Sequence, residues 1–105
     1  MNLLLRSGGM VVLEQPEDFG RFHLEIDPAV GTLEAAQAGL SLLGHIESRE
    51  LAWIDHGALF ELGRSTAAEP EAWATQAQAM LDKAARYGWV RAESPSIKSH
   101  IIWRA

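Results

Sequence analysis

Histidines that lie two residues before a carboxylate are the side chains of this sequence with the clearest capacity for chemistry. His23 precedes Glu25, and His45 precedes Glu47. Side chains two positions apart on a β-strand project from the same face, so each pair would place an imidazole beside a carboxylate. That combination serves proton transfer or the binding of a divalent ion. The same alternation is typical of any solvated strand face, which is the simpler interpretation.

Other arrangements of reactive residues are absent or have a structural explanation. The histidines lack the i, i+4 spacing of a metal-binding helix, so we predict no metal site. Asp55 and His56 are adjacent and would point in different directions, and Asp55 is expected to cap a helix instead. No serine lies in a Gly-x-Ser-x-Gly turn, and the chain has no cysteine. We therefore expect no cofactor.

Composition limits the classes of partner. The chain has 105 residues, the length of one domain (residues 1–105), with 14 acidic and 9 basic side chains and a net charge of −5. Nucleic acids and anionic membranes require concentrated positive charge, so neither partner is expected. The end of the chain resembles the winged-helix class in its order of helix, Gly-Trp-Val strand and hairpin, but its helix carries too few cations for DNA. The absence of cysteine predicts a cytoplasmic protein, and residues 1–5 lack the features of a signal peptide or membrane span.

Two main helices and one short helix are predicted. The last and longest begins at Pro70, which suits a first helical turn, and ends at Gly88, which suits a left-handed cap. Its apolar residues recur every three or four positions and predict one buried stripe: Trp73, Ala77, Met80, Leu81, Ala84 and Tyr87. An earlier helix is expected before residue 44, with residues 27–28 and Thr32 as competing starts. A short helix after Asp55 is expected to stop at Gly63, and residues 16–20 form either a helix or a turn.

The remaining apolar segments predict strands at residues 1–5, 10–13, 20–26, 51–54, 89–93 and 97–103, with a turn at residues 94–96. Residues 10–13 are continuously apolar, which is typical of a central strand buried on both faces. Residues 20–26 alternate, with Phe22, Leu24 and Ile26 on one side. The element order predicts an α+β fold, with a mostly antiparallel sheet, two main helices on one face and a C-terminal β-hairpin.

The sheet face away from the helices carries the residues that we consider for binding: Arg21, His23, Glu25, Trp89, Lys98, His100 and Ile102. Trp89 and Ile102 are apolar side chains on a charged face, whereas Trp53, Trp73 and Trp103 are expected in the core. A doubly apolar strand at residues 10–13 would also need cover on this face. A twin subunit, a small molecule or the short helix after Asp55 would each supply it.

Two functions follow. We expect a small interaction or ligand-binding module that forms a homodimer through this face, with Trp89 as the main contact. The alternative is a cofactor-free enzyme of the lyase or isomerase type. In that enzyme His23 or His100 would transfer protons together with Glu25, and Arg21 or Lys98 would hold an anionic substrate.

Overall fold

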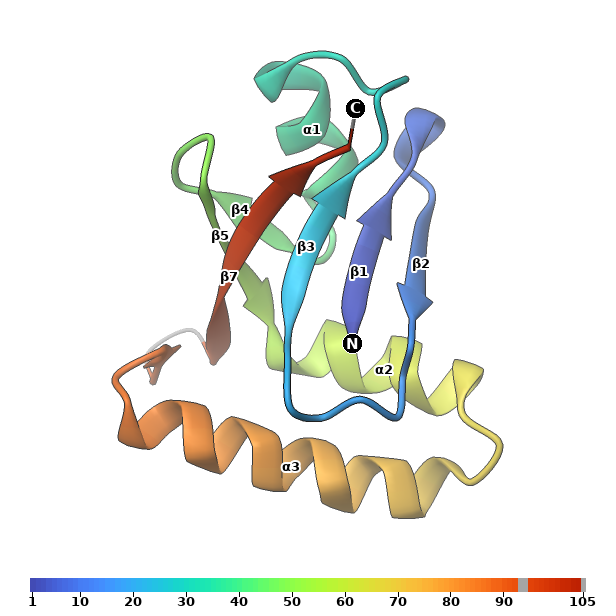
Figure 1. The fold of residues 1–105 in the computed structure, drawn as a ribbon, viewed down its shortest axis with the longest axis vertical. Coiled ribbons are helices and arrows are strands. Elements are labelled where there is room, and N and C mark those ends of the chain that lie inside the picture. The colour runs from blue at the N-terminus through green and yellow to red at the C-terminus, as the bar shows by residue number, and fades with distance from the viewer. Residues whose placement is uncertain (93–94, 105) are drawn as a thin grey trace.

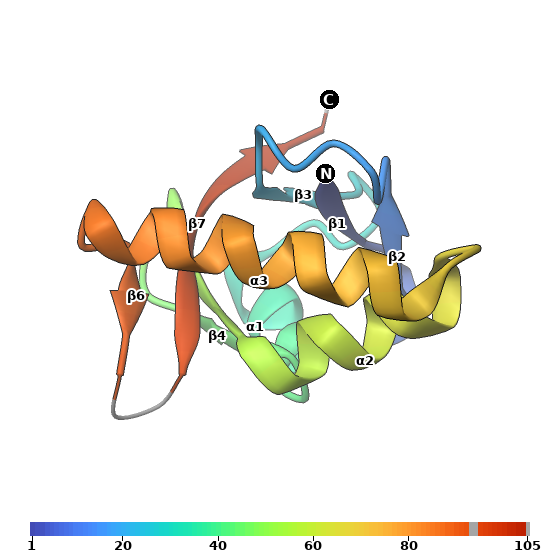
Figure 2. The ribbon, with the colours of Figure 1, turned by 90° about the horizontal axis from the view of Figure 1, so that it is seen from below.

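The computed structural model of the protein describes residues 1–92 and 95–104. Within them the chain has an α+β fold with three α-helices, one short 3-10 helix and a curled, mixed, seven-stranded sheet (Figures 1 and 2). In chain order the elements are β1 (Asn2–Leu5), η1 (Ser7–Gly9), β2 (Val11–Glu14), β3 (His23–Ile26), α1 (Leu33–Leu40), β4 (Gly44–Ile46), β5 (Leu51–Asp55), α2 (His56–Thr66), α3 (Pro70–Arg86), β6 (Val90–Arg91) and β7 (Ser96–Trp103).

The strand order of the sheet is β2-β1-β3-β7-β5-β4, and β6 also pairs with β7. β3 runs parallel to both β1 and β7, whereas the other pairs are antiparallel. The expectation of a mostly antiparallel sheet is therefore wrong, because the sheet is mixed. The parallel pair of β1 and β3 arises because residues 15–22 pass the end of β1, so that β3 starts on the other side of that strand from β2 (Figure 1).

β7 shares one of its edges between two strands. β5 pairs with residues from Ser96 to His100 along one edge. On the other edge, β6 pairs with Ser96 and Ile97, and β3 pairs with residues from His100 to Trp103. The sheet therefore splits between β3 and β6. The predicted C-terminal hairpin is present in part as β6 and β7, although β6 has only two residues. The end of the predicted strand, residue 93, and the start of the predicted turn, residue 94, lie outside the described residues.

The prediction of a central strand at residues 10–13 is wrong. β2 is an edge strand, and Met10 and Val12 are 58% and 37% exposed. The strand buried on both faces is β1, whose four residues are all buried. A run of apolar residues indicates a strand, but it does not say whether a neighbour pairs with each edge.

The helices lie at two places on the sheet. α2 and α3 pack against each other across the end at which β1, β3 and β7 begin (Figures 1 and 2), and α1 packs against β1 and β4. The start of α1 is settled in favour of Thr32, whose hydroxyl accepts a hydrogen bond from the Ala35 N–H at 3.1 Å. Asp55 caps α2 as predicted, with Oδ2 accepting from the Ala58 N–H at 2.9 Å. Residues 16–20 contain two turns and no helix.

α2 does not stop at Gly63, as the sequence suggested, but continues to Thr66. Gly63 lies where α2 meets the indole ring of Trp73 on α3, and a Cβ at this position would overlap that ring. Trp73 is 3% exposed and its Nε1–H donates to the Pro16 carbonyl at 2.7 Å. The glycine therefore allows close packing between two helices and does not end one.

Candidate functional site

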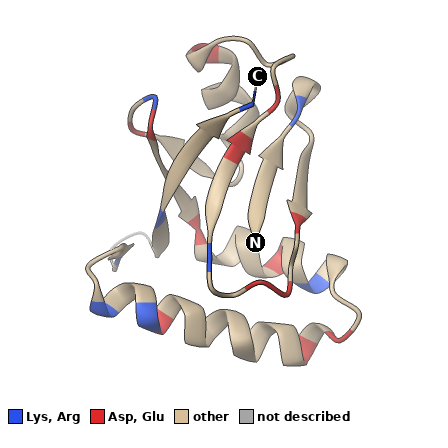
Figure 3. Cartoon of the chain, viewed as in Figure 1, with Lys and Arg blue, Asp and Glu red and all other residues tan. Residues whose placement is uncertain are grey.

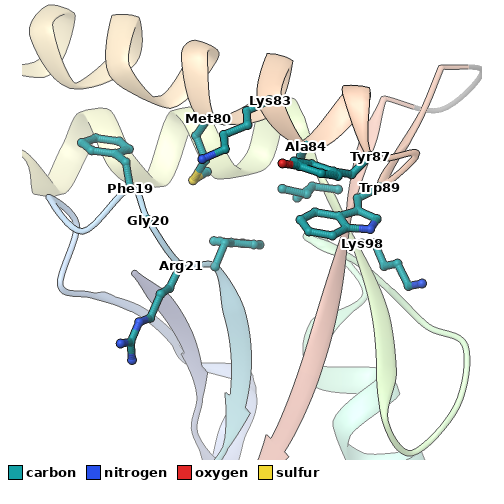
Figure 4. A pocket seen from close by; sticks show the side chains of 11 residues that line it. Phe19, Gly20, Arg21, Met80, Lys83, Ala84, Tyr87, Trp89 and Lys98 are labelled. Carbon is teal, nitrogen blue, oxygen red and sulfur yellow. The ribbon is translucent and has the colours of Figure 1, made fainter.

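The principal candidate site is the gap between β3 and β6 beneath the C-terminal end of α3. We call it the β3–β6 crevice, and its cavity has a volume of about 290 Å³. Three segments line it: residues 19–22 before β3, α3 and its end from Met80 to Trp89, and residues 97–98 of β7 (Figure 4). A second hollow adjoins it on the outer face of the sheet and adds Leu51 and His100 to three shared residues, Phe22, Trp89 and Lys98.

Trp89 is held in place by the way α3 ends. Gly88 has φ of 77° and donates its N–H to the Ala85 carbonyl at 3.0 Å, while the Trp89 N–H donates to the Ala84 carbonyl at 3.0 Å. This pair of hydrogen bonds is the Schellman motif, which requires a left-handed residue and so favours glycine. The Trp89 carbonyl in turn accepts the Lys98 N–H at 2.7 Å. Both backbone polar groups of Trp89 are therefore fixed.

Trp89 and Tyr87 form an exposed aromatic stack at the rim of the crevice. Their ring centroids are 4.8 Å apart and the rings are inclined by 23°. Trp89 is 47% exposed, as expected for a residue on a contact surface, and Tyr87 is 61% exposed. The prediction that Tyr87 belongs to the buried stripe of the helix is wrong. Tyr87 is the C-cap residue, with φ of −94° and ψ of 3°, so its side chain leaves the helical periodicity.

Positive side chains gather around the crevice. Arg21, Lys83 and Lys98 line it, and the last two are the only lysines of the chain. Basic residues are visible at the start of β3, at the start of β7 and at the C-terminal end of α3 (Figure 3). Lys83 extends across the cavity beside Met80, whereas Arg21 and Lys98 extend outward from its rim (Figure 4). Within residues 1–92 and 95–104, none of the three forms an ion pair, and no carboxylate lines the crevice.

A polar network crosses the outer face of β1 and β3. The His23 Nε2 lies 2.9 Å from Glu25 Oε2, so the pair predicted from strand alternation is formed. Arg104 joins this pair to β2, because its Nε donates to Glu25 Oε1 at 2.8 Å and its Nη2 donates to Glu14 Oε1 at 2.7 Å. Asn2 Nδ2 also donates to Glu14 Oε1, at 2.9 Å. We call these five residues the outer-face network.

The outer-face network has two consequences. It lies over β1, whose outward residues Asn2 and Leu4 are only 4% and 7% exposed, so part of the cover that the sequence required comes from the chain itself. The hydrogen bond from the Arg104 guanidinium also holds the pKa of Glu25 below its ordinary value, with a smaller contribution from His23. Glu25 is therefore a carboxylate with both oxygen atoms engaged.

The other histidines have separate environments. His100 is the register partner of His23 on the neighbouring strand, so these two imidazoles come from adjacent positions. His45 is exposed, and Glu47 instead accepts from Trp53 Nε1 at 3.2 Å and from Arg91 at 2.9 Å. Burial lowers the pKa of His56, and its Nε2 has no hydrogen-bond partner among the described residues. The part of the chain that the structure describes contains no group of three or more potential metal ligands.

The candidates from the sequence therefore divide among three places. Arg21, Trp89 and Lys98 line the crevice, and His100 lines the adjoining hollow. His23 and Glu25 belong to the outer-face network, whereas Ile102 is a 42% exposed residue on the same face. Sequence reasoning did not identify Lys83 or Tyr87 as site residues, and it assigned Tyr87 to the buried stripe of the helix. One signal was available in the sequence. Lys83 and Tyr87 are four positions apart at the end of the predicted helix, and Trp89 follows directly.

The remaining tryptophans are largely covered. Trp53 is 8% exposed, although it lies on the outer face, because the Arg91 guanidinium stacks 3.9 Å from its ring centroid. Trp103 is half-buried, and its Nε1–H donates to the Arg49 carbonyl at 2.8 Å. Trp89 thus differs from the other three in presenting its ring at a cavity.

Among the described residues, no helix combines the length and the apolar character needed to cross a membrane. Comparisons with protein-family models, with curated proteins and with solved structures find no match for this chain.

Proposed function

We propose that this protein binds a small anionic molecule with an apolar body in the β3–β6 crevice. The observation that supports the proposal is the charge of the site: Arg21, Lys83 and Lys98 line an apolar cavity to which no described residue contributes a carboxylate, in a chain whose net charge is −5. Cations beside low-dielectric walls concentrate the field and attract an anion. Phe19, Phe22 and Met80 supply walls against which an apolar body would pack.

The size of the cavity sets the size of the ligand. A volume of 290 Å³ corresponds to about ten water molecules at roughly 30 Å³ each, so it suits a ligand of about 10–15 non-hydrogen atoms. Such a ligand, at about 0.3 kcal/mol per atom, would bind with a Kd of roughly 1 mM. Charge-assisted hydrogen bonds to the lysines would strengthen this to about 0.1 mM. The binding assay should therefore extend to millimolar ligand.

Isothermal titration calorimetry with naphthalene-2-carboxylate and its neutral amide tests the proposal. Both probes have the same shape, so a preference for the carboxylate measures the contribution of charge. We expect Lys83→Gln and Lys98→Gln each to weaken carboxylate binding by about threefold to tenfold, since each removes an exposed cation from the site. Arg6→Gln is the matched control, because it removes the same charge from an exposed position just after β1, at the opposite end of that strand from α3. Equal losses in all three variants, or no preference for the carboxylate, would contradict the proposal.

A second candidate is the enzyme in which histidine transfers a proton. The observation that favours it is the 2.9 Å contact between His23 and Glu25, with His100 at the register position beside His23 and at the edge of the outer hollow. An imidazole that is oriented by a carboxylate is a good general base. Phenylpyruvate, an aromatic 2-oxo acid with exchangeable protons, is the probe. Loss of its exchange in D₂O on His23→Gln or His100→Gln, with the fold intact, would support this candidate, whereas wild-type protein without exchange activity would refute it.

Homodimer formation through the outer face and a cytoplasmic location both stay predictions. Exposed apolar side chains on that face include Val12 and Ile102, which lie beside the charged outer-face network. A stable dimer interface usually has a more apolar centre, so we favour ligand binding over dimerisation. Light scattering of the purified chain would decide between a monomer and a dimer.

A further inference from the structure

We infer that the apolar body of the ligand is a flat aromatic ring that stacks on Trp89. The inference rests on the proposed binding function and names the class of ligand as an aromatic carboxylate or an equivalent aromatic anion. Trp89 is one of three residues that line both the crevice and the adjoining outer hollow, together with Phe22 and Lys98, and it has the largest aromatic ring of the three. Its position between them makes it the natural platform for a ligand that enters from either side.

The platform is assembled before any ligand arrives. Tyr87 packs against the Trp89 ring at 4.8 Å, and the N–H and carbonyl of Trp89 are both hydrogen-bonded. A ring held in this way loses little conformational freedom when a ligand binds, so more of the stacking energy appears as affinity. Trp89 nevertheless leaves 47% of its surface exposed. That surface is available to a second ring.

The end of the helix does not by itself account for this stack. A Schellman motif is often accompanied by an apolar contact between the residue after the glycine and the last turn of the helix, which explains why Trp89 lies near Ala84. It does not require Tyr87 to stack on that ring while staying 61% exposed. Two rings of this kind present a π-surface that a planar ligand recognises and a saturated one does not.

The two lysines of the crevice favour an acidic group on the ligand. Lys83 extends from α3 and Lys98 from β7, on either side of Trp89 (Figure 4). A ring stacked on Trp89 would therefore lie between the two elements that carry the lysines. A single carboxylate attached directly to the ring would meet one of them while the ring stays on the platform.

Two carboxylates of equal charge distinguish recognition of the aromatic ring from recognition of the charge. Naphthalene-2-carboxylate and decahydronaphthalene-2-carboxylate have the same carbon skeleton and the same charge, but only the first is flat and aromatic. We expect wild-type protein to bind the aromatic acid about threefold to tenfold more tightly, the range typical of aromatic pairs. In Trp89→Leu, which keeps an apolar side chain, the two acids should bind equally. Trp89→Met also removes the ring and should bind the two acids equally, so it serves if the leucine variant fails to fold, whereas Trp89→Phe keeps a ring and should retain the preference.

The outcomes distinguish this inference from the proposed function. Equal binding of both acids by wild-type protein, together with weaker binding of naphthalene-2-carboxamide, would overturn the aromatic ligand class and leave anion binding intact. A preference for the aromatic acid that survives Trp89→Leu would also overturn it, because the ring would then be recognised elsewhere. Failure of both acids to bind more tightly than the carboxamide would overturn the proposed function itself.

Discussion

Replacing Gly63 by alanine would introduce one methyl group into the contact between α2 and α3. Gly63 lies inside α2, where alanine is the better helix former by about 1 kcal/mol. Its Cβ, however, would lie well within 3.0 Å of the Cη2, Cζ2 and Cζ3 atoms of Trp73. Carbon atoms in contact normally stay about 3.5–4.0 Å apart, so the indole must move by roughly 1.5–2 Å.

The movement of the indole determines how far Gly63→Ala lowers the free energy of unfolding. Trp73 packs against Phe19 and Phe60, with ring centroids 6.1 Å and 5.9 Å away, and its Nε1–H donates to Pro16. Forcing a methyl group into a packed core costs about 1–3 kcal/mol, and losing the hydrogen bond costs about 1 kcal/mol more. After subtracting the helix-propensity gain, we expect Gly63→Ala to lower the free energy of unfolding by about 1–3 kcal/mol. The midpoint of thermal unfolding should fall by about 4–12 °C.

Urea unfolding followed by circular dichroism measures this change, and a double-mutant cycle tests its cause. Trp73→Phe removes the atoms that the new methyl group would meet, so Gly63→Ala should cost less in that background. We expect a coupling free energy of at least about 1 kcal/mol between the two sites. A stabilising Gly63→Ala, or additive effects of the two substitutions, would refute the close-packing explanation for this glycine.

Substitutions at three further positions test the helix end and the titrating groups. Gly88→Ala should destabilise the protein by about 1 kcal/mol in urea unfolding, because φ of 77° strains an L-residue, and Gly88→Asn, which tolerates this conformation, should recover part of the loss. Burial keeps the folded pKa of His56 below its ordinary value of 6.5, so the unfolded chain takes up the proton first and the free energy of unfolding should decrease as pH falls below 6.5. His56→Gln should flatten that decrease, and an unchanged pH profile would be contrary to expectation. The Arg104 hydrogen bond depresses the pKa of Glu25 below 4.5, so its stabilising contribution is present above pH 4.5 and lost as pH falls further. Glu25→Gln should remove this acid-dependent loss, as measured by urea midpoints between pH 5 and 3.

The features that the sequence predicted well are those set by nearby residues. α3 begins at Pro70 and is followed by a left-handed Gly88 because helix ends depend on a few adjacent side chains. Asp55 caps α2 for the same reason. Alternation on β7 also follows from local geometry, so Lys98 and His100 are exposed while Ile97 and Ile101 are buried.

The features that could not be predicted depend on contacts between distant segments. Gly63 was interpreted as the end of a helix because the residues around it do not indicate that Trp73 packs against this position. β2 looked central because apolar composition does not reveal an unpaired edge. The parallel pairing of β3 follows from the path of the preceding loop, which has no simple sequence signal.

The candidate site could be predicted only in part for the same reason. The crevice exists because β3 and β6 meet the same edge of β7 at different points. Single residues such as Arg21, Trp89 and Lys98 were identified from strand parity, but the grouping of these residues with Lys83 and Tyr87 requires that topology. Strand order, which the sequence left open, therefore decided the composition of the site.

The most direct test of anion binding in the crevice is a ¹H–¹⁵N correlation NMR titration of the labelled protein with naphthalene-2-carboxylate. Binding should shift the amide signals of residues 19–22, 83–89 and 97–98, and the indole N–H signal of Trp89 should move with them. The signals of β2, β4 and α1 should stay in place. Saturable shifts centred on another part of the chain, or no shifts at millimolar ligand, would contradict the account.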